Sequence, residues 1–176
     1  MSGIITSLGS ILPTASGGSP TNMGLSTLAG NADTWSADAV WLYRVQATVS
    51  GTLQNAYVYA NGTNVSVKKA LVFNAASSGS PTSADTYIVS SGIITASGSA
   101  GWNTAAFASG NITSGNYYLI GCVMSIASAT QQVLTENATP LYYLASSGYF
   151  LTPPADAGNV TSSSNFGRIS MYVTIL

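Results

Sequence analysis

Hydrophobic and polar residues alternate with a period of two along most of the chain after residue 39. Residues 40–49 place Trp41 and Tyr43 on one face of the segment, with Leu42 and Arg44 on the other. This is the spacing of a β-strand, whose successive side chains point to opposite faces. No segment of helical length carries an apolar stripe at i, i+3, i+4 and i+7. The pattern therefore predicts an all-β chain.

Turn-forming residues divide this alternating region into about eight strands. Asn61-Gly62 is a strong hairpin signal, because both residues tolerate the positive φ that a tight turn requires. Many short strands between turn-rich loops are typical of a two-sheet antiparallel sandwich. The strands that we predict span residues 40–49, 53–60, 65–73, 85–89, 102–107, 116–126, 141–144 and 168–175.

The first 39 residues show a different pattern, and we predict an irregular N-terminal arm over 1–39 and one domain over 40–176. Glycines and prolines interrupt any periodicity in the arm. Its apolar residues near the start fit one short turn, and together with Trp35 they are our candidates for contact with a partner. These candidates are Ile4, Ile5, Leu8, Ile11, Leu12 and Trp35.

The segment 116–126 is apolar on both faces. Tyr117, Leu119 and Val123 alternate with apolar residues such as Ile120 and Cys122. An antiparallel sandwich strand normally shows one polar face to water. Its outward face must therefore be covered, either by a loop or arm of the same chain or by another subunit.

Charge is scarce along the whole chain. The 176 residues include four basic and five acidic side chains, and no histidine. Charge is the main protection of a soluble domain against self-association, so this surface favours a component of a larger assembly. A formal net charge of −1 excludes an electrostatic nucleic-acid binder. No stretch reaches the roughly 20 apolar residues of a membrane helix.

The same inventory argues against an enzyme. Without histidine there is no Ser-His-Asp or Cys-His arrangement and no ordinary zinc site. Asp33 and Asp38 are the only acidic pair close in sequence, and solvated loop carboxylates or turn caps explain them better than a glycosidase pair or, with Asp156, a calcium site. Cys122 has no basic neighbour in sequence, which favours a buried, unreactive thiol. We expect no cofactor and no metal.

Two stretches resemble the jelly-roll domains of bacteriophage virion proteins. They are Gly101-Trp102-Asn103-Thr104 with Phe107, and Ile112-Thr113-Ser114-Gly115-Asn116-Tyr117-Tyr118-Leu119-Ile120-Gly121. The resemblance covers about residues 40–176 and implies an eight-stranded jelly roll, often trimeric, used for capsid decoration, as a fibre head or to bind sugars. It carries over no catalytic residue. We therefore expect a non-enzymatic protein located in the virion, a homotrimeric capsid-decoration (cement) or fibre protein that binds itself and other virion proteins.

The alternative function is a carbohydrate-binding or host-receptor-binding module. Such a module requires exposed aromatic rings beside amides and hydroxyls, and four aromatic residues in or near Ser- and Asn-rich loops qualify. The candidates for glycan contact are Trp102, Tyr142, Tyr143 and Tyr149. Aromatic residues of a sandwich are more often core or interface, and we place Trp41 and Tyr43 in the core because they share a strand face with Val45 and Val49.

Overall fold

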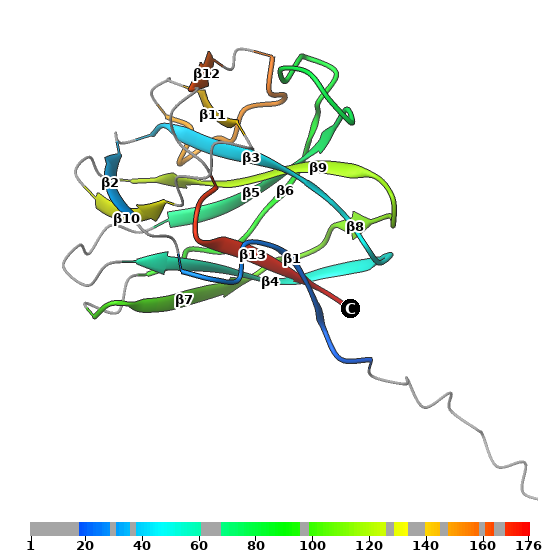
Figure 1. Cartoon of the computed structure of the whole chain (residues 1–176), viewed down its shortest axis with the longest axis horizontal. Helices are drawn as coiled ribbons and strands as arrows, with labels where there is room; N and C mark the ends of the chain where they lie inside the picture. Colours follow the sequence, from blue (N-terminus) through cyan, green and yellow to red (C-terminus); the bar gives the residue numbers. More distant parts are fainter. Residues whose placement is uncertain are drawn as a thin grey trace, which may run out of the picture.

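A computed structural model of the chain shows an all-β protein made of two antiparallel sheets (Figure 1). It describes residues 18–28, 31–35, 38–60, 68–95, 99–125, 129–133, 140–144, 148–158, 161–163 and 168–176, and only the backbone of strands β2, β10 and β12. Within these ranges there are thirteen strands and no helix. The predicted all-β antiparallel sandwich is confirmed.

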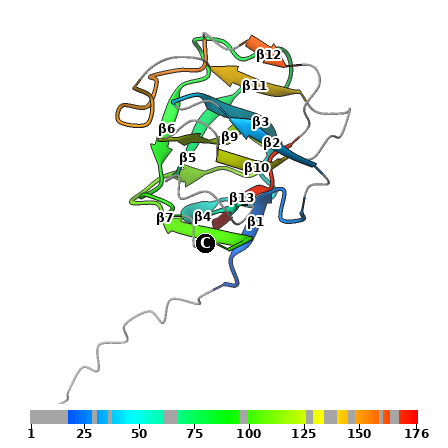
Figure 2. The same cartoon turned by 90° about the vertical axis from the view of Figure 1, so that its left-hand side faces the viewer.

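The two sheets lie face to face as two layers (Figures 1 and 2). Sheet A has the order β1 (Thr21–Gly24), β13 (Met171–Ile175), β4 (Gly51–Ala60), β10 (Ala129–Val133) and β2 (Asn31–Trp35), with β7 (Gly101–Ala106) and β8 (Asn111–Ile112) also paired to β4. Sheet B has the order β12 (Thr161–Ser163), β11 (Leu141–Leu144), β3 (Val40–Gln46), β9 (Tyr117–Met124), β5 (Lys68–Ala75) and β6 (Tyr87–Ser90).

The arm that we predicted to be irregular contains two strands. β1 pairs with β13 from Thr21 to Gly24, and β2 pairs with β10 from Asn31 to Trp35. The sequence pattern did not predict β1, because four residues that are mostly polar or glycine are too few to show a period of two. Sheet A therefore begins within the first 39 residues, and residues 1–17 lie outside the described part of the chain.

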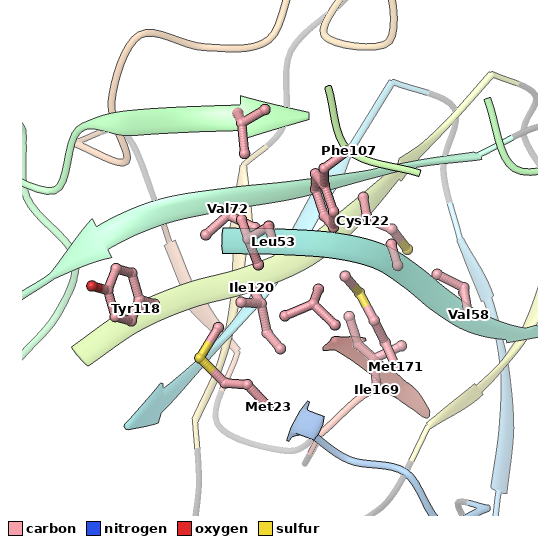
Figure 3. Packing of buried hydrophobic residues seen from close by; sticks show 14 of the residues in the cluster. Met23, Leu53, Val58, Val72, Phe107, Tyr118, Ile120, Cys122, Ile169 and Met171 are labelled. Atoms are coloured by element: carbon pink, nitrogen blue, oxygen red, sulfur yellow. The ribbon is translucent and has the colours of Figure 1, made fainter. Parts of the chain in front are cut away.

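The main core lies between the sheets (Figure 3). Sheet A contributes the inward residues of β4 and β13, such as Val58 and Met171, and sheet B contributes those of β5 and β9, such as Val72 and Ile120. Near the end of the chain, alternate residues face this core: Ile169, Met171, Val173 and Ile175 are all buried there. Tyr43 is fully buried and Trp41 packs against the same core, as predicted.

The outward face of β9 is covered by the chain itself. Leu119 and Val123 are fully buried in a second cluster, which includes Ala157 and has Tyr149 and Phe150 packed against it. This answers the question left open by the two apolar faces of this strand. Its outer side therefore gives no support to a subunit interface.

Two polar contacts hold the covering segment 148–158 in place at Phe150. The Lys69 ammonium donates to the Phe150 carbonyl oxygen at 2.9 Å and lies 4.8 Å from the centre of its ring. The Phe150 amide donates to the Asp38 carboxylate at 3.2 Å. Lys69, which interrupts the apolar face of its strand, thus anchors the segment that covers that face.

A buried hydroxyl links the two sheets. Tyr43 in β3 donates a hydrogen bond to the Met171 carbonyl oxygen in β13 and accepts one from the Leu25 amide at 3.0 Å. Burial, the largest influence, raises the pKa of Tyr43 well above its ordinary value. The phenol is therefore neutral across the physiological range and satisfies two backbone groups in the core.

Gly121 allows the backbones of β3 and β9 to approach closely. It lies opposite Leu42 of β3, and a Cβ added to it would lie 1.7 Å from the Trp41 carbonyl oxygen. That position is flanked by strands on both sides, since β5 pairs with β9 at Leu71. Because β9 is hydrogen-bonded to β3 on one side and to β5 on the other, its backbone cannot shift away from an added methyl group without breaking these pairings.

We expect Gly121→Ala to lower the free energy of unfolding by about 3 kcal/mol or more, because the new methyl group collides with backbone rather than with a flexible side chain. Urea denaturation measures this. Gly101→Ala is the matched control, because an added Cβ in β7 meets nothing within 4 Å, and its change should stay within about 0.5 kcal/mol. Equal stability of the two variants would contradict the close approach.

We expect Tyr43→Phe to lower the free energy of unfolding by about 1–3 kcal/mol near neutral pH, because two buried backbone groups lose their partner. The folded chain holds the phenolic proton more tightly than the unfolded chain does, so this contribution is complete below about pH 10 and falls as the pH rises further. The difference between wild type and variant should therefore shrink at about pH 11 in the same denaturation experiment. A difference that does not change with pH would refute the raised pKa.

Candidate binding face

Four aromatic rings form a cluster on the outer face of sheet A. Tyr57 and Tyr172 stack with their ring centres 4.6 Å apart and their planes 7° apart. Trp102 meets Tyr172 edge to face at 5.1 Å and meets Tyr59 in the same way at 5.6 Å. All four side chains are partly exposed. We call these four residues the aromatic cluster.

Strand register brings the cluster together. Tyr57 in β4 lies opposite Tyr172 in β13, and Tyr59 lies opposite Trp102 in β7. The neighbours Ala56 and Val58 point inward to the core, so alternation turns the tyrosines outward. Rings on adjacent strands of a sheet are within reach of one another, both directly opposite and diagonally.

A break in register lies beside the cluster. The pairing of β4 with β13 shifts between Val173 and Ile175, so β4 has one more residue than its partner there. The Thr174 hydroxyl accepts a hydrogen bond from the Asn55 amide at 3.1 Å. Bulges of this kind bend a strand and change the direction of side chains next to binding sites. Here the side-chain contact stabilises the irregular backbone.

The face around the rings is polar and uncharged. Asn22 and Thr104 are exposed, and Asn55 is partly exposed. None of the residues of β1, β4, β7, β8 and β13 carries a formal charge. Burial, and then the neighbouring Tyr57, raise the pKa of Tyr172. The phenol of Tyr172 is therefore a neutral hydrogen-bonding group at physiological pH.

The structure separates Trp102 from the other predicted glycan contacts, which all come from the side of sheet B. Tyr142 is 2% exposed, and its hydroxyl accepts from the Arg44 guanidinium at 3.1 Å and donates to the Gly79 carbonyl oxygen at 3.2 Å. Its ring is not accessible, so the prediction of a glycan contact at Tyr142 is wrong. Tyr143 packs against Trp41 at 4.7 Å, and Tyr149 packs on the outer cluster of sheet B.

The structure describes only one of the predicted partner-binding residues, and only its backbone. Ile4, Ile5, Leu8, Ile11 and Leu12 lie outside the described residues. The backbone of Trp35 is described at the end of β2, where it pairs with Ala129 of β10. Their role in partner contact stays a prediction.

The side chains of Asp85 and Asp156 accept hydrogen bonds from backbone amides. Asp85 is buried and accepts from the amides of Ala76 at 2.9 Å and Thr82 at 2.7 Å. Asp156 accepts from the Gly158 amide at 2.8 Å. Each of these side chains thus organises a turn. The described residues contain no group of three metal-ligating side chains, and no helix among them is long and apolar enough to cross a membrane.

Two further titratable side chains lie in the core. Cys122 is buried, as predicted, and burial raises the pKa of its thiol to about 12. Lys68 is also buried, and burial lowers the pKa of its ammonium. A thiol with a raised pKa is protonated at neutral pH and is a poor nucleophile.

One cleft of about 360 Å³ lies between β1 and β3. Two of the four cationic residues of the chain, Arg44 and Arg168, contribute to its walls together with Asn22 and Gln46. The guanidinium of Arg44, however, donates to Tyr142 and, at 2.9 Å, to the Gly79 carbonyl oxygen. Since these contacts belong to the packing of sheet B, the cleft is a weaker candidate than the aromatic cluster.

Sequence reasoning found one ring of the four. Tyr57 and Tyr59 fall on the outward side of their predicted strand, and Tyr172 alternates with the inward residues of the last strand. That alternation indicates that the three tyrosine rings point away from the core. The pairing of β4 with both β7 and β13 was needed to show that the rings converge.

No protein-family model matches the chain, and no curated protein sequence matches it.

We expect the stacked tyrosines to stabilise each other by about 0.5–1.5 kcal/mol beyond their separate contributions. A double-mutant cycle of Tyr57→Ala and Tyr172→Ala, measured by urea denaturation, gives this coupling energy. The control cycle combines Tyr57→Ala with Tyr149→Ala, since Tyr149 packs on the other sheet; its coupling should be zero within about 0.3 kcal/mol. A zero coupling for the first pair would contradict the stack.

Proposed function

We propose that this chain is a non-enzymatic structural protein of a bacteriophage virion, a homotrimeric capsid-decoration or fibre protein that binds neighbouring virion subunits. The observation that carries the proposal is the nested order of the strand pairs. β5 pairs with β6, β4 with β7, β3 with β9, and β1 with β13.

Such nesting supports a jelly roll. In that fold a long antiparallel ribbon is rolled up, so that the first strand pairs with the last and the two central strands pair with each other. The eight strands of the four pairs divide between the sheets as β1-β13-β4-β7 and β3-β9-β5-β6. Jelly rolls are frequent among viral capsid and lectin domains. The strand order thus agrees with the resemblance of the sequence to phage jelly-roll domains.

The uncharged exterior supports a role in an assembly. With four basic and five acidic side chains in 176 residues, little charge is available to keep copies apart. Large aliphatic side chains are exposed in the loops and at the chain end: Leu28, Ile93, Leu151 and Leu176, with Leu151 80% exposed. Interfaces between proteins are depleted of charge at their centre, so surfaces of this kind lose little when they are buried.

The non-enzymatic part of the proposal rests on residue chemistry. Histidine, the side chain that most often acts as a general base or activates a nucleophile, is absent from the chain. Asp85 and Asp156 are used as backbone acceptors, and the Cys122 thiol is buried and protonated. What is left for the surface is recognition through neutral polar and aromatic groups.

Sedimentation equilibrium tests the assembly role. We expect the purified chain to have a mass of about 54 kDa, which is three times the 17.9 kDa of one chain. The apparent mass should change little with salt concentration, because the contacts are not electrostatic. A monodisperse monomer at high protein concentration would overturn the proposed homotrimer.

A further inference from the structure

We infer that the outer face of sheet A is a binding site for a neutral glycan, with the aromatic cluster of Tyr57, Tyr59, Trp102 and Tyr172 as its platform. The inference goes beyond the structural role proposed above and does not depend on the number of subunits. It moves the glycan contact away from Tyr142, Tyr143 and Tyr149 and onto one sheet.

The first argument is the rigidity of the platform. The rings extend from β4, β7 and β13, and each ring contacts at least one other. β4 is paired on both edges, with β13 on one side and β7 on the other. A ligand that binds such a surface has few side chains to immobilise, which lowers the entropic cost of binding.

The second argument is the mixture of groups on the face. A sugar ring has an apolar C–H face that packs on an aromatic ring, and hydroxyl groups at its rim that need hydrogen-bond partners. The cluster supplies rings, and the same face supplies the exposed side chains of Asn22 and Thr104 and the partly exposed side chain of Asn55. Apolar surface with a few polar groups is the usual composition of a small-molecule site.

The third argument is charge. The strands that carry the cluster, β4, β7 and β13, and their neighbours β1 and β8 contain no charged residue. Asp33 lies in β2, at the opposite edge of the sheet from β1. A sialylated or sulfated ligand would find no cation on the strands that carry the rings, so the cluster favours neutral sugars. Binding to such a site is insensitive to salt, because screening acts on charges.

The kinds of exposed side chain favour a glycan over a second protein at this face. Among the residues whose side chains the structure describes, the large exposed aliphatic ones are Leu28, Ile93, Leu151 and Leu176, and they lie outside the strands, in loops or at the chain end. The centre of the face carries rings with hydroxyl groups instead. Leu176 lies beside Thr52 of β4, and Ile93 follows Gly92, which lies beside Ala106 of β7. Both therefore lie near the start of β4, whereas the aromatic cluster lies towards its end, at Tyr57 and Tyr59.

The experiment uses the full chain and an array of neutral oligosaccharides of glucose, galactose, mannose and N-acetylglucosamine, with sialylated and sulfated glycans beside them. We expect binding to at least one neutral class, no preference for the acidic glycans, and less than about a twofold change in affinity when the salt concentration is raised tenfold. Calorimetry with the oligosaccharide that binds best then gives the dissociation constant.

The variants locate the site. Trp102→Ala and Tyr172→Ser should each weaken binding about tenfold or more, since each removes one ring of the platform. Thr104→Glu places a bulky charge on an exposed position of the same face and should also weaken binding, without removing a ring that stabilises the fold. Tyr149→Ser, on the side of sheet B, is the matched control and should bind as wild type does.

The outcomes separate this inference from the structural role. Failure to bind any neutral glycan, or unchanged binding by both Trp102→Ala and Thr104→Glu, would overturn the glycan site. A fall in solution mass of Thr104→Glu would also overturn it, because the face would then be a contact between copies. If wild type is a monomer that binds a neutral glycan through these residues, the glycan site stands and the homotrimer fails.

Discussion

The structure depends on the burial of sheet B on both of its faces. β9 is apolar on both sides, and its residues Leu119, Ile120 and Val123 are fully buried. One side packs on sheet A, and the other is covered by the segment 148–158. The polar groups of Asp38 and Lys69 hold that segment at Phe150. A sheet that is buried on both faces needs a packing partner on each side, and here sheet A and the segment 148–158 of the same chain provide them.

This arrangement gives the two outer surfaces of the sandwich different character. The outer side of sheet B is closed by its own loop. The outer side of sheet A instead carries the half-exposed rings around Trp102 among neutral polar residues. The proposed roles follow this division: loops with exposed aliphatic residues such as Leu151 serve contact between proteins, and the aromatic face of sheet A serves a sugar.

Much of the fold could be predicted from the sequence, because a period of two is a local property. The strands around Trp41, Tyr57 and Met171 and their inward faces follow from it. β1 was missed because its four residues are too few to show a period, and the strand that it pairs with, β13, lies at the other end of the chain. The burial of Tyr142, a predicted glycan contact, also depends on distant residues, since Arg44 and Gly79 enclose its hydroxyl. The convergence of Tyr57, Trp102 and Tyr172 also depends on long-range register, which local patterns do not contain.

The central claim is that the rings on the outer face of sheet A are partly open to solvent, while Tyr43 and Tyr142 of sheet B are closed in by the chain. Hydroxyl-radical footprinting of the dilute full chain, read by mass spectrometry, tests it residue by residue. The account predicts rapid modification of Trp102 and Tyr172 and protection of Tyr43 and Tyr142. Protection of Trp102 equal to that of Tyr142, or rapid modification of Tyr142, would contradict it.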